Sequence, residues 1–362
     1  MEAIKTKKHR ALKITGICVG VIVIILVAGI IYINNMLGKV KYEPVVDNPT
    51  IVEPPPDDDD PSIGDDDPTT KENSTQQEID DLGNEIKENI NNSDTQLMSN
   101  EKVFNVLLIG SDSRSGTGYG NSDTMILVSI NKETKKIVMT SFLRDIYISI
   151  PGSGNSRLNS AYARGGASLL IQTIQDNFKV KIDRYASIYF MDFIDVIDKV
   201  GGVTITVTDE EFPYLNRYVQ NINSLKGLPK DDGLLPAAGE NLLLTGKQAL
   251  GYARIRCVGT DFARTQRQRT ILNQVFNKTK KLNLIEQNNL MNVLLPDITT
   301  NMGKGELLSL LLNMTTYANY SVEQVTIPFN GGYKNLVING QDVLGLDFAA
   351  NIAQIQQAVY GG

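Results

Sequence analysis

The sequence predicts an α/β domain with three layers, α/β/α, around a central mixed sheet. Residues 101–362 alternate short apolar runs with amphipathic ones, as strands and helices alternate in this class of fold. A basic N-terminus, a long uncharged apolar run and an acidic, proline-rich segment come before them. We therefore expect one folded domain, preceded by a single transmembrane helix and a disordered linker.

The apolar run, Ile14–Ile33, carries no charged residue and follows a cluster of lysines and arginine in residues 1–13. Its length is enough for a helix to cross a bilayer. Positive charge before a membrane span stays in the cytoplasm, so residues 1–13 are predicted to be a cytoplasmic tail and 14–33 a signal-anchor. A cleaved signal peptide is the alternative, but the run is long and no clear A-x-A site follows it. The domain is then predicted to be extracytoplasmic, on a single-pass protein of the cell membrane.

Residues 34–100 are predicted to be a disordered linker. Between 41 and 100, three lysines stand against seventeen acidic residues, in a stretch rich in proline, aspartate and asparagine. Self-repulsion and few apolar groups favour an extended spacer, with a transient helix over 76–90. The aspartate runs 57–60 and 65–67 are better explained as solvated charge than as calcium ligands.

The acidic linker accounts for the net charge of −6, since residues 101–362 carry 26 Lys/Arg against 23 acids. A mildly basic domain with locally concentrated arginine suits a small anion better than a long nucleic acid. Within it, strands are predicted at 103–110, 124–131, 136–142, 146–151, 186–190, 201–207 and 323–329. Helices are predicted at 167–178, 191–200, 245–253, 261–280, 284–292, 304–318 and 341–359, and 209–240 is expected to be loop-rich.

The scarcity of histidine and cysteine excludes several kinds of catalytic and metal site. His9 is the single histidine and lies in the basic tail, and the two cysteines are Cys18, in the apolar run, and Cys257. This excludes a Ser-His-Asp or Cys-His site and a histidine-bound zinc in the domain. Any reaction there must use carboxylates and arginines, with or without a hard metal ion.

The densest functional signal is YARIRCVGTDFARTQRQRT, residues 252–270, which contains five arginines and one acid. Arginine offers a planar fork of donors that matches phosphate oxygens. Thr260 and Asp261 are suitable helix N-caps, and Arg264, Arg267 and Gln268 then share one helical face. We interpret the stretch as two arginine segments that close on one phosphate group. A basic surface helix with scattered ion pairs is the alternative.

A glycine-rich loop, GSDSRSGTGYGNSDTM at 110–125, connects two predicted strands. Glycines let successive N–H groups turn toward an anion. Asp112 and Asp123 could together hold Mg²⁺, which takes one or two carboxylates with waters and phosphate oxygens. The alternative is a flexible connection in which both aspartates cap turns. No Walker motif follows the glycines.

Two further segments carry polar residues at the ends of apolar ones. Arg144 and Asp145 interrupt a strand end, as a local ion pair or as side chains directed into a site. In RLNSAYARGG, residues 157–166, Asn159 and Tyr162 are three apart, and helix capping is the simpler explanation for the asparagine.

These four segments together resemble the LytR-CpsA-Psr family of cell-wall ligases. The resemblance covers about 103–272 and consists of VLLIGSDSR, SDTMILVSIN, SFLRDIYI, LNSAYARGG, GGVTITV, LTGKQALGYARIR and DFARTQRQ, in that order. It implies that residues 101–362 are a catalytic domain of this family. Two departures stand out: Asn121 occupies a place that is often arginine, and Ser141–Ile146 lacks the proline and threonine of the family pattern.

The resemblance implies a role for each matching residue. Asp112 and Asp123 fall on magnesium-binding acids, and Asp123 also on the acid proposed as base. With Asp123, Arg144 and Arg264 are the predicted catalytic residues. The predicted pyrophosphate-binding residues are Arg114, Arg144, Arg254, Arg256, Arg264, Arg267 and Gln268.

The implied activity is Mg²⁺-dependent phosphotransfer. A glycopolymer such as teichoic acid or capsule would move from undecaprenyl pyrophosphate to peptidoglycan, where it forms a phosphodiester. Two alternatives remain at this point. One is a non-catalytic polyprenyl-phosphate-binding sensor or scaffold, and the other is a transcriptional attenuator of cell-envelope genes.

Overall fold

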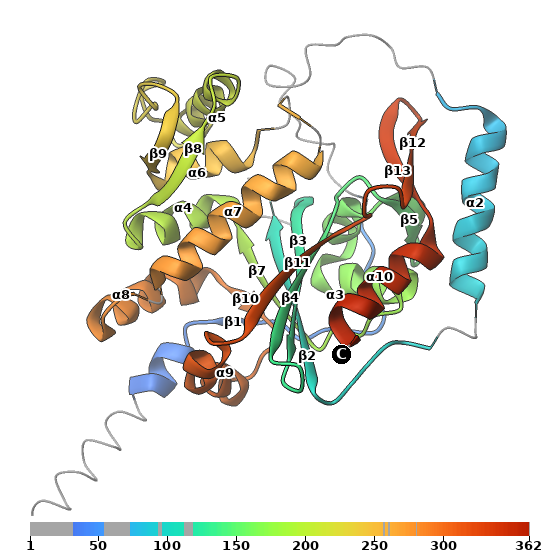
Figure 1. Cartoon of the computed structure of the whole chain (residues 1–362), viewed down its shortest axis with the longest axis horizontal. Helices are drawn as coiled ribbons and strands as arrows, with labels where there is room; N and C mark the ends of the chain where they lie inside the picture. The colour runs from blue at the N-terminus through green and yellow to red at the C-terminus, as the bar shows by residue number, and fades with distance from the viewer. Residues whose placement is uncertain are drawn as a thin grey trace, which may run out of the picture.

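A mixed sheet forms the centre of the fold (Figure 1). The computed structural model describes residues 32–53, 73–92, 96–111, 119–255, 258–259, 261–279 and 281–361. Within these ranges the strand order is β1-β10-β7-β2-β3-β4-β11. The strands are β1 (Lys41–Tyr42), β2 (Val103–Ser111), β3 (Ser122–Asn131), β4 (Lys136–Phe142), β7 (Arg184–Tyr189), β10 (Thr299–Thr300) and β11 (Ser321–Ile327). The predicted α/β fold with a central mixed sheet is confirmed.

One edge of the sheet collects the ends of several strands. β2, β3 and β4 are antiparallel neighbours, whereas β7 runs parallel to β2 and β11 runs parallel to β4. The carboxyl ends of β2, β4, β7 and β11 therefore meet at the same edge, where β3 begins. We call this the carboxyl edge. In α/β sheets, ligands bind outside the carboxyl ends of the strands.

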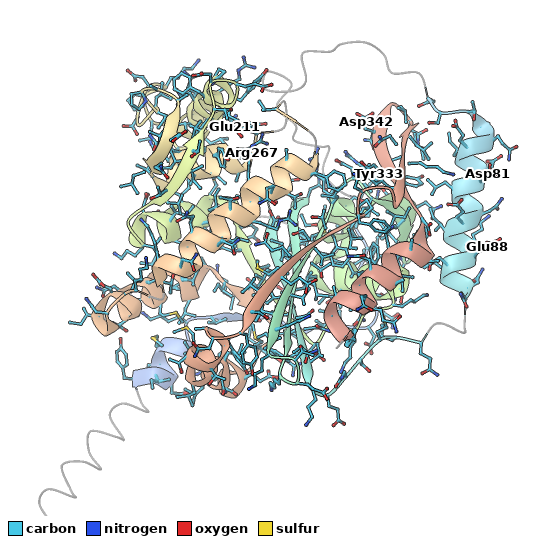
Figure 2. All side chains as sticks on the ribbon, viewed as in Figure 1. Asp81, Glu88, Glu211, Arg267, Tyr333 and Asp342 are labelled. Carbon is cyan, nitrogen blue, oxygen red and sulfur yellow. The ribbon has the colours of Figure 1, made fainter. Side chains whose placement is uncertain are left out.

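The predicted disordered linker is wrong over much of its described length. Residues 76–91 form helix α2, which starts with a capping box in which Thr75 and Glu78 bond each other reciprocally. Leu82 and Ile86, four residues apart, are buried in the main core, and Asp81 and Glu88 lie on the outer side (Figure 2). The high proportion of acidic residues outweighed these two apolar residues in the prediction of disorder. Their side chains give α2 an apolar face that packs on the core.

The segment 41–53 is also part of the fold. Lys41 and Tyr42 pair with β10, and the backbone N–H of Val52 donates to the carbonyl of Arg164 at 2.9 Å. Residues 1–31, with nearly all of the predicted anchor, and residues 54–72 lie outside the described ranges. Within those ranges, no helix combines the length and hydropathy needed to cross a bilayer.

We expect Ile86→Ala to lower the free energy of unfolding by about 2–5 kcal/mol, the usual cost of a large cavity in a core. Ile86 is 1% exposed. Urea unfolding of the full chain in detergent measures the effect. Glu88→Ala, on the exposed side of α2, should change stability by less than about 0.5 kcal/mol. Equal small effects of the two changes would show that α2 does not stabilise the domain.

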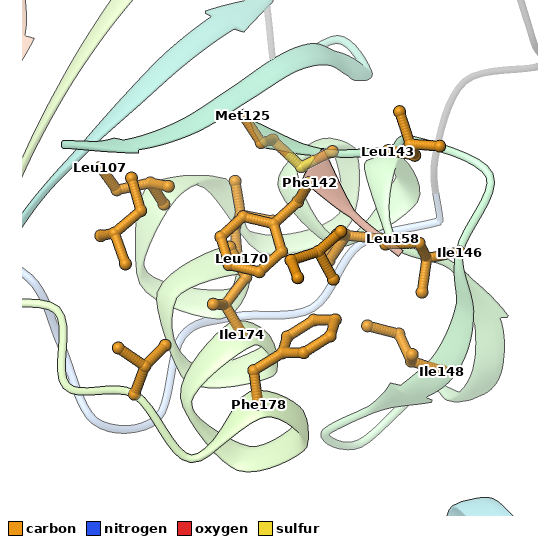
Figure 3. Close-up of a cluster of buried hydrophobic side chains, with 14 of the residues drawn as sticks. Leu107, Met125, Phe142, Leu143, Ile146, Ile148, Leu158, Leu170, Ile174 and Phe178 are labelled. Carbon is orange, nitrogen blue, oxygen red and sulfur yellow. The ribbon is translucent and has the colours of Figure 1, made fainter. Parts of the chain in front are cut away.

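The main core lies on one face of the sheet. Leu107, Leu127 and Phe142 point from β2, β3 and β4 toward helix α3 (Asn159–Phe178). The rings of Phe142 and Phe178 are 4.9 Å apart (Figure 3). Helix α10 (Phe348–Tyr360) and the hairpin of β5 (Tyr147–Ile150) and β6 (Gly154–Arg157) complete this layer.

Helices α4 (Phe190–Lys199), α7 (Asp261–Thr279), α8 (Leu284–Leu294) and α9 (Lys304–Tyr317) lie on the other side. The Nη1 of Arg269, in α7, donates to the Oγ1 of Thr326 at 2.6 Å. Thr326 alternates along β11 with Val325 and Ile327, which belong to the main core. Helix α7 therefore covers the face opposite to α3.

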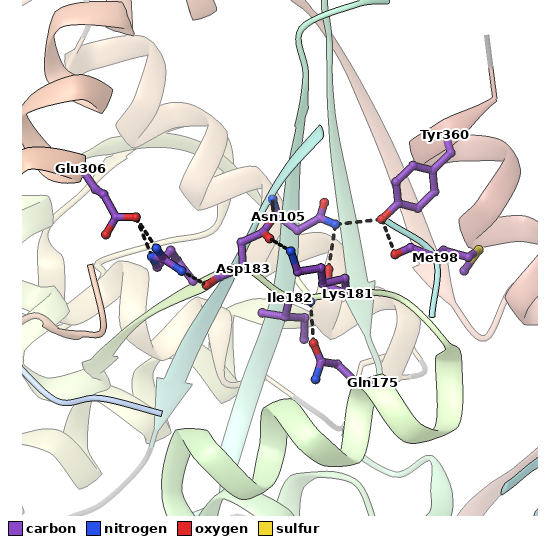
Figure 4. A network of polar contacts seen from close by, with 9 residues as sticks. Met98, Asn105, Gln175, Lys181, Ile182, Asp183, Glu306 and Tyr360 are labelled. Carbon is purple, nitrogen blue, oxygen red and sulfur yellow. Dashed lines mark hydrogen bonds and ion pairs between the residues drawn. The ribbon is translucent and has the colours of Figure 1, made fainter. Parts of the chain in front are cut away.

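A polar network joins several elements at the edge of the sheet opposite to the carboxyl edge (Figure 4). The amide Nδ2 of Asn105 donates to the Lys181 carbonyl at 2.7 Å and to the Tyr360 hydroxyl at 3.0 Å. Its backbone N–H donates to the Asp183 carboxylate at 2.9 Å. These bonds join β2, the start of β7 and the end of α10, so we regard the network as structural.

Residues 203–253 form a smaller lobe, and its core also includes Ile197 of α4 and Ile271 of α7. It contains β8 (Val203–Val207), α5 (Glu211–Leu225), β9 (Gly239–Leu244) and α6 (Gly246–Ala253). The prediction that 209–240 is loop-rich is wrong for α5. Leu215, Val219 and Ile222 are buried at helical spacing, and Pro213 is tolerated because it lies in the first turn.

The predicted helix 341–359 is in fact a strand followed by a helix. β12 (Tyr333–Ile338) and β13 (Gln341–Leu346) form a hairpin, and α10 begins at Phe348. The two turn residues, Asn339 and Gly340, have φ of 53° and 74°. Asn-Gly favours this two-residue turn because both residues tolerate positive φ, and that signal is readable in the sequence.

Candidate phosphate-binding site

An acid–arginine pair lies at the carboxyl edge. The Oδ1 of Asp123, the second residue of β3, is 3.2 Å from the Nη1 of Arg144, just beyond β4. Both side chains are about nine-tenths buried. Arg144 also contacts Asp145 at 3.3 Å, and Asp145 contacts Arg157 at 3.3 Å. Arg144 therefore forms a local ion pair with Asp145 and also contacts Asp123, so both explanations given for this dipeptide apply.

The N-terminus of α3 lies against this pair. The Ser122 hydroxyl donates to the carbonyl of Asn159 at 3.3 Å, and the N–H of Asn159 donates to the carbonyl of Arg144 at 3.2 Å. The Asn159 side chain is 1% exposed, and neither atom of its amide has a hydrogen-bond partner among the described residues. The capping explanation for Asn159 is wrong, because α3 has no side-chain cap bond and its N-cap is Leu158.

Tyr119 anchors the end of the glycine-rich loop. Its ring packs on the kink of α3 at Gly166, where an added Cβ would lie 2.5 Å from the ring. Its hydroxyl donates to the Glu43 carboxylate at 2.8 Å. Burial and this acid raise the pKa of Tyr119 to about 12, so it stays a neutral donor. Asp112 and Arg114 lie in the part of the loop outside the described residues.

Helix α7 brings Arg264 to the carboxyl edge. Further along α7, Arg269 contacts Thr326, near the end of β11, while the ring of Phe262 is 5.5 Å from Tyr333, beyond that end. Arg264 lies between them, about 7.5 Å along the axis from Arg269 at 1.5 Å per residue. It is level with the strand ends and 2% exposed. Gln268, one turn later on the same face, is also buried.

Arg254 is held by α5. Its guanidinium carbon is 5.1 Å from the centre of the Tyr218 ring, a cation–π geometry, and its Nη1 donates to Asn221 at 3.4 Å. Arg254 follows α6 directly, as the C-cap. Arg256, the other arginine of this segment, lies outside the described residues.

Arg267 has partners within the protein at all three nitrogens. Its Nε donates to the Glu211 carboxylate at 2.8 Å, and its Nη1 and Nη2 donate to the carbonyls of Ile255 and Val258 at 3.1 and 2.6 Å. Glu211 and Arg267 lie next to each other between α5 and α7 (Figure 2). In this geometry Arg267 holds the segment between Arg254 and Arg264 through the carbonyls of Ile255 and Val258. The sequence spacing placed it on the face of Arg264 but could not name its partner.

Glu211→Gln separates the two roles of Arg267. If Arg267 holds the segment, the change should weaken binding of a polyprenyl pyrophosphate by about 10-fold, the value of one charged hydrogen bond. If Arg267 binds phosphate directly, removing a neighbouring acid should strengthen binding. Titration of the full chain in detergent measures the affinity. Arg269→Gln is the matched control, since Arg269 is buried in the same helix but contacts β11.

The oxygen ligands at the carboxyl edge fit a hard divalent ion. Asp123 supplies a carboxylate, and the buried amide of Asn159 supplies an oxygen that no described group uses. Mg²⁺ prefers such oxygens together with waters and phosphate oxygens. No group of three or more His, Cys, Asp or Glu that could hold a metal was found in the described ranges, so an ion here would depend on Asp112 and on the ligand.

The structure thus defines an α/β domain with a buried acid–arginine pair at the carboxyl ends of its strands, where such folds bind their ligands. The particular family follows from comparison with known proteins. The chain matches the LytR_cpsA_psr family model over residues 69–359 and belongs to that family.

Curated relatives agree with this assignment. The chain is 34% identical over 208 residues to "Biofilm regulatory protein A" of Streptococcus mutans, covering 54% of this chain and 48% of the relative. It is 33% identical over 227 residues to a polyisoprenyl-teichoic acid–peptidoglycan teichoic acid transferase, TagU, of Oceanobacillus iheyensis, covering 60% and 65%. The matched region is thus about half to two thirds of these relatives.

Solved structures share the fold. TagT of Bacillus subtilis superposes with a TM-score of 0.55 at 22% identity, over 74% of this chain and 96% of TagT. A TagT structure with bound octaprenyl pyrophosphate lipid superposes with a TM-score of 0.54 at 23% identity, over 74% and 95%. At this identity the likeness establishes the fold.

Proposed function

We propose that this protein is a membrane-anchored phosphotransferase that moves a glycopolymer, such as teichoic acid or capsule, from undecaprenyl pyrophosphate to peptidoglycan. The observation that carries the proposal is the buried Asp123–Arg144 pair at the carboxyl edge. It is supported by Arg264, which is buried in the first turn of α7, a helix that contacts the end of β11 through Arg269. A related structure holds a polyprenyl pyrophosphate lipid, and relatives are named teichoic acid transferases. Both support the same substrate class.

The two faces of the sheet differ in a way that suits a lipid substrate. Leu107, Leu127 and Val138, on the α3 face, are completely buried. Their neighbours Leu108, Val128 and Met139 point to the α7 side and are half-buried. Apolar side chains left partly uncovered offer a prenyl chain a surface. We place the lipid between this face and the helices around α4 and α7.

The proposed roles combine the positions of the described side chains with the sequence resemblance, which alone supports the roles of Asp112, Arg114 and Arg256. Arg144, Arg254 and Arg264 bind diphosphate oxygens, with Gln268 and, from the loop segments, Arg114 and Arg256. Arg267 holds the segment between Arg254 and Arg264. Asp123, with Asp112 and the Asn159 amide, would hold Mg²⁺. When bound, this ion supplies positive charge that neutralises the diphosphate.

The reaction forms one phosphorus–oxygen bond and breaks another. An acceptor hydroxyl oxygen on peptidoglycan bonds to the phosphorus that carries the glycopolymer, and Asp123 takes the hydroxyl proton. The bond from that phosphorus to the bridging oxygen breaks, and the lipid leaves as its monophosphate. Fixed arginines stabilise the charge that gathers on the leaving phosphate.

Transfer by the purified full chain tests the proposal. In detergent with a lipid-pyrophosphate-linked glycopolymer and peptidoglycan fragments, we expect a covalent polymer–peptidoglycan product that depends on Mg²⁺ and disappears with a chelator. Binding of the donor without any product would favour a non-catalytic sensor or scaffold.

The proposed location has a separate test. Protease added to intact cells should digest the domain, because we place it outside the membrane with residues 1–13 in the cytoplasm. Full protection of the domain in intact cells, with digestion after lysis, would reverse the orientation and favour the transcriptional alternative.

A further inference from the structure

The first described residues of the chain are fastened between α8 and α9. The hydroxyl of Tyr32 donates to Asn288, and the Nζ of Lys39 donates to Asn292 at 2.6 Å, both in α8. Gly38 lies beside Lys304, the first residue of α9. Figure 1 shows this segment, in blue, next to both helices.

This attachment sets the distance from the domain to a bilayer. The segment includes the last two residues of the apolar run Ile14–Ile33, the anchor in the proposed function, and continues it. From Ile33 to Lys39 a helical path covers about 9 Å at 1.5 Å per residue. If the run spans the membrane, α8 and α9 are therefore held at its surface, with no long spacer between them.

Helix α9 has the composition of a helix that meets an apolar phase. Its sequence, KGELLSLLLNMTTY, contains five leucines, yet none of its residues is buried. Leu312 is 73% exposed and Met314 is 36% exposed. On α8, Ile285 is also 73% exposed. Leu312 and Ile285 are thus large apolar side chains exposed on the two helices that contact the segment 32–39, and exposed apolar surface marks interaction sites when it is contiguous.

The polar residues around these helices suit lipid headgroups. Lys39, Lys281 and Lys304 are exposed, and lysines near a bilayer are attracted to anionic lipids. The rings of Tyr317 and Tyr320, at the end of α9, are 5.6 Å apart. Tyrosine is enriched at membrane–water interfaces because its ring is apolar and its hydroxyl is polar.

We propose that α8 and α9, together with the segment 32–39, form a surface that docks on the lipid bilayer. This rests on the membrane anchor in the proposed function. The helix α9 leads into β11 at Ser321, which pairs with Lys136 at the start of β4. Docking therefore places the bilayer at the edge of the sheet opposite to the carboxyl edge. The phosphate site is then about 23 Å from the membrane surface, the length of a seven-residue strand, and the lipid donor must reach along the α7 face.

The sequence contains no tryptophan, so a single substitution gives a unique fluorescent reporter. Leu312→Trp reports on α9. Leu243→Trp is the matched control, because Leu243 is an exposed leucine (64%) in β9, at the far end of the domain in Figure 1. The full chain of each variant is inserted in vesicles of phosphatidylcholine and phosphatidylglycerol, with and without bromine on the acyl chains.

We expect brominated lipid to quench the Leu312→Trp emission by about half or more and to leave Leu243→Trp nearly unchanged. If brominated lipid quenched neither variant, the docking surface would be overturned. Shielding of the Leu312→Trp side chain from acrylamide without quenching by bromine would assign the surface to a second copy of the chain, and would overturn it as well.

Two further measurements separate this proposal from the proposed function. Flotation of the vesicles tests the anchor: a chain that does not float removes the anchor and the docking surface together. Glycopolymer transfer by the floated wild-type protein tests the enzyme. Glycopolymer transfer without quenching of Leu312→Trp would support the proposed enzyme activity and reject the docking surface. Quenching without transfer would support the docking surface and reject the enzyme activity.

Discussion

Asp123→Ala is expected to lower the transfer rate by about 10³-fold, within the range that general base catalysis supplies. The carboxylate lies at the start of β3, 3.2 Å from Arg144. The change removes the proposed proton acceptor and one oxygen ligand of the proposed ion. Single-turnover transfer by the full chain, with donor in excess over its Kd, measures the rate without the contribution of binding.

Asp145→Ala is the matched control for Asp123→Ala. Asp145 contacts the same arginine, at 3.3 Å, and also pairs with Arg157. Its removal costs Arg144 one ion pair but leaves the carboxylate of β3 in place, so we expect a loss of about 10-fold or less. Similar losses from both changes would mean that Asp123 acts by holding Arg144 and not as the base.

Asp123→Asn divides the role further, since asparagine keeps an oxygen ligand but cannot accept the proton. If the base is essential, the asparagine variant should be as slow as the alanine variant at every Mg²⁺ concentration. Recovery of the rate at high Mg²⁺ would instead show that Asp123 acts mainly as a metal ligand.

Residue spacing predicted the face of α7 correctly but not what each side chain touches. Three- and four-residue spacing puts Arg264, Arg267 and Gln268 together in any helix, and the structure buries all three. The partner of Arg267 is Glu211, more than fifty residues earlier, in a helix that the sequence did not suggest. Such a pairing depends on how the small lobe docks on α7, which local patterns do not contain.

Two other differences had signals that composition obscured. α2 lies in a strongly acidic region, and its two buried residues, Leu82 and Ile86, were outweighed by the charge. The hairpin at Asn339-Gly340 was absorbed into a longer helical pattern, although Asn-Gly is a strong turn signal. In both places a short local pattern proved more informative than the average over the region.

Arg264→Ala is expected to lower the transfer rate by about 10²–10³-fold, or about 2.7–4 kcal/mol, the usual cost of losing one preorganised donor to a developing anion. Arg264 is 2% exposed and lies in the first turns of α7, at the level of the strand ends. A fixed guanidinium at a helix N-terminus adds to the favourable field of the helix. The change should also weaken binding of a polyprenyl pyrophosphate.

Arg264→Lys tests whether geometry or charge is responsible. Lysine keeps the positive charge but loses the planar fork that binds two phosphate oxygens, so we expect it to restore binding in part and the rate very little. Arg269→Ala, on the same helix, removes a buried arginine that contacts Thr326 and should leave the affinity near that of the wild type. Unchanged binding and transfer in Arg264→Ala would remove α7 from the site.

Together, the Arg264 and Asp123 variants distinguish an enzyme from a binding protein. An enzyme with the proposed site loses binding and turnover with Arg264→Ala, but keeps donor binding and loses turnover with Asp123→Ala. A lipid-binding sensor has no turnover to lose, and its affinity should rise when Asp123 is removed, because a negative charge disappears beside a bound anion. The sign of the affinity change in Asp123→Ala, measured with and without Mg²⁺, therefore decides between an enzyme in which this carboxylate holds a metal ion and a protein that only binds the lipid.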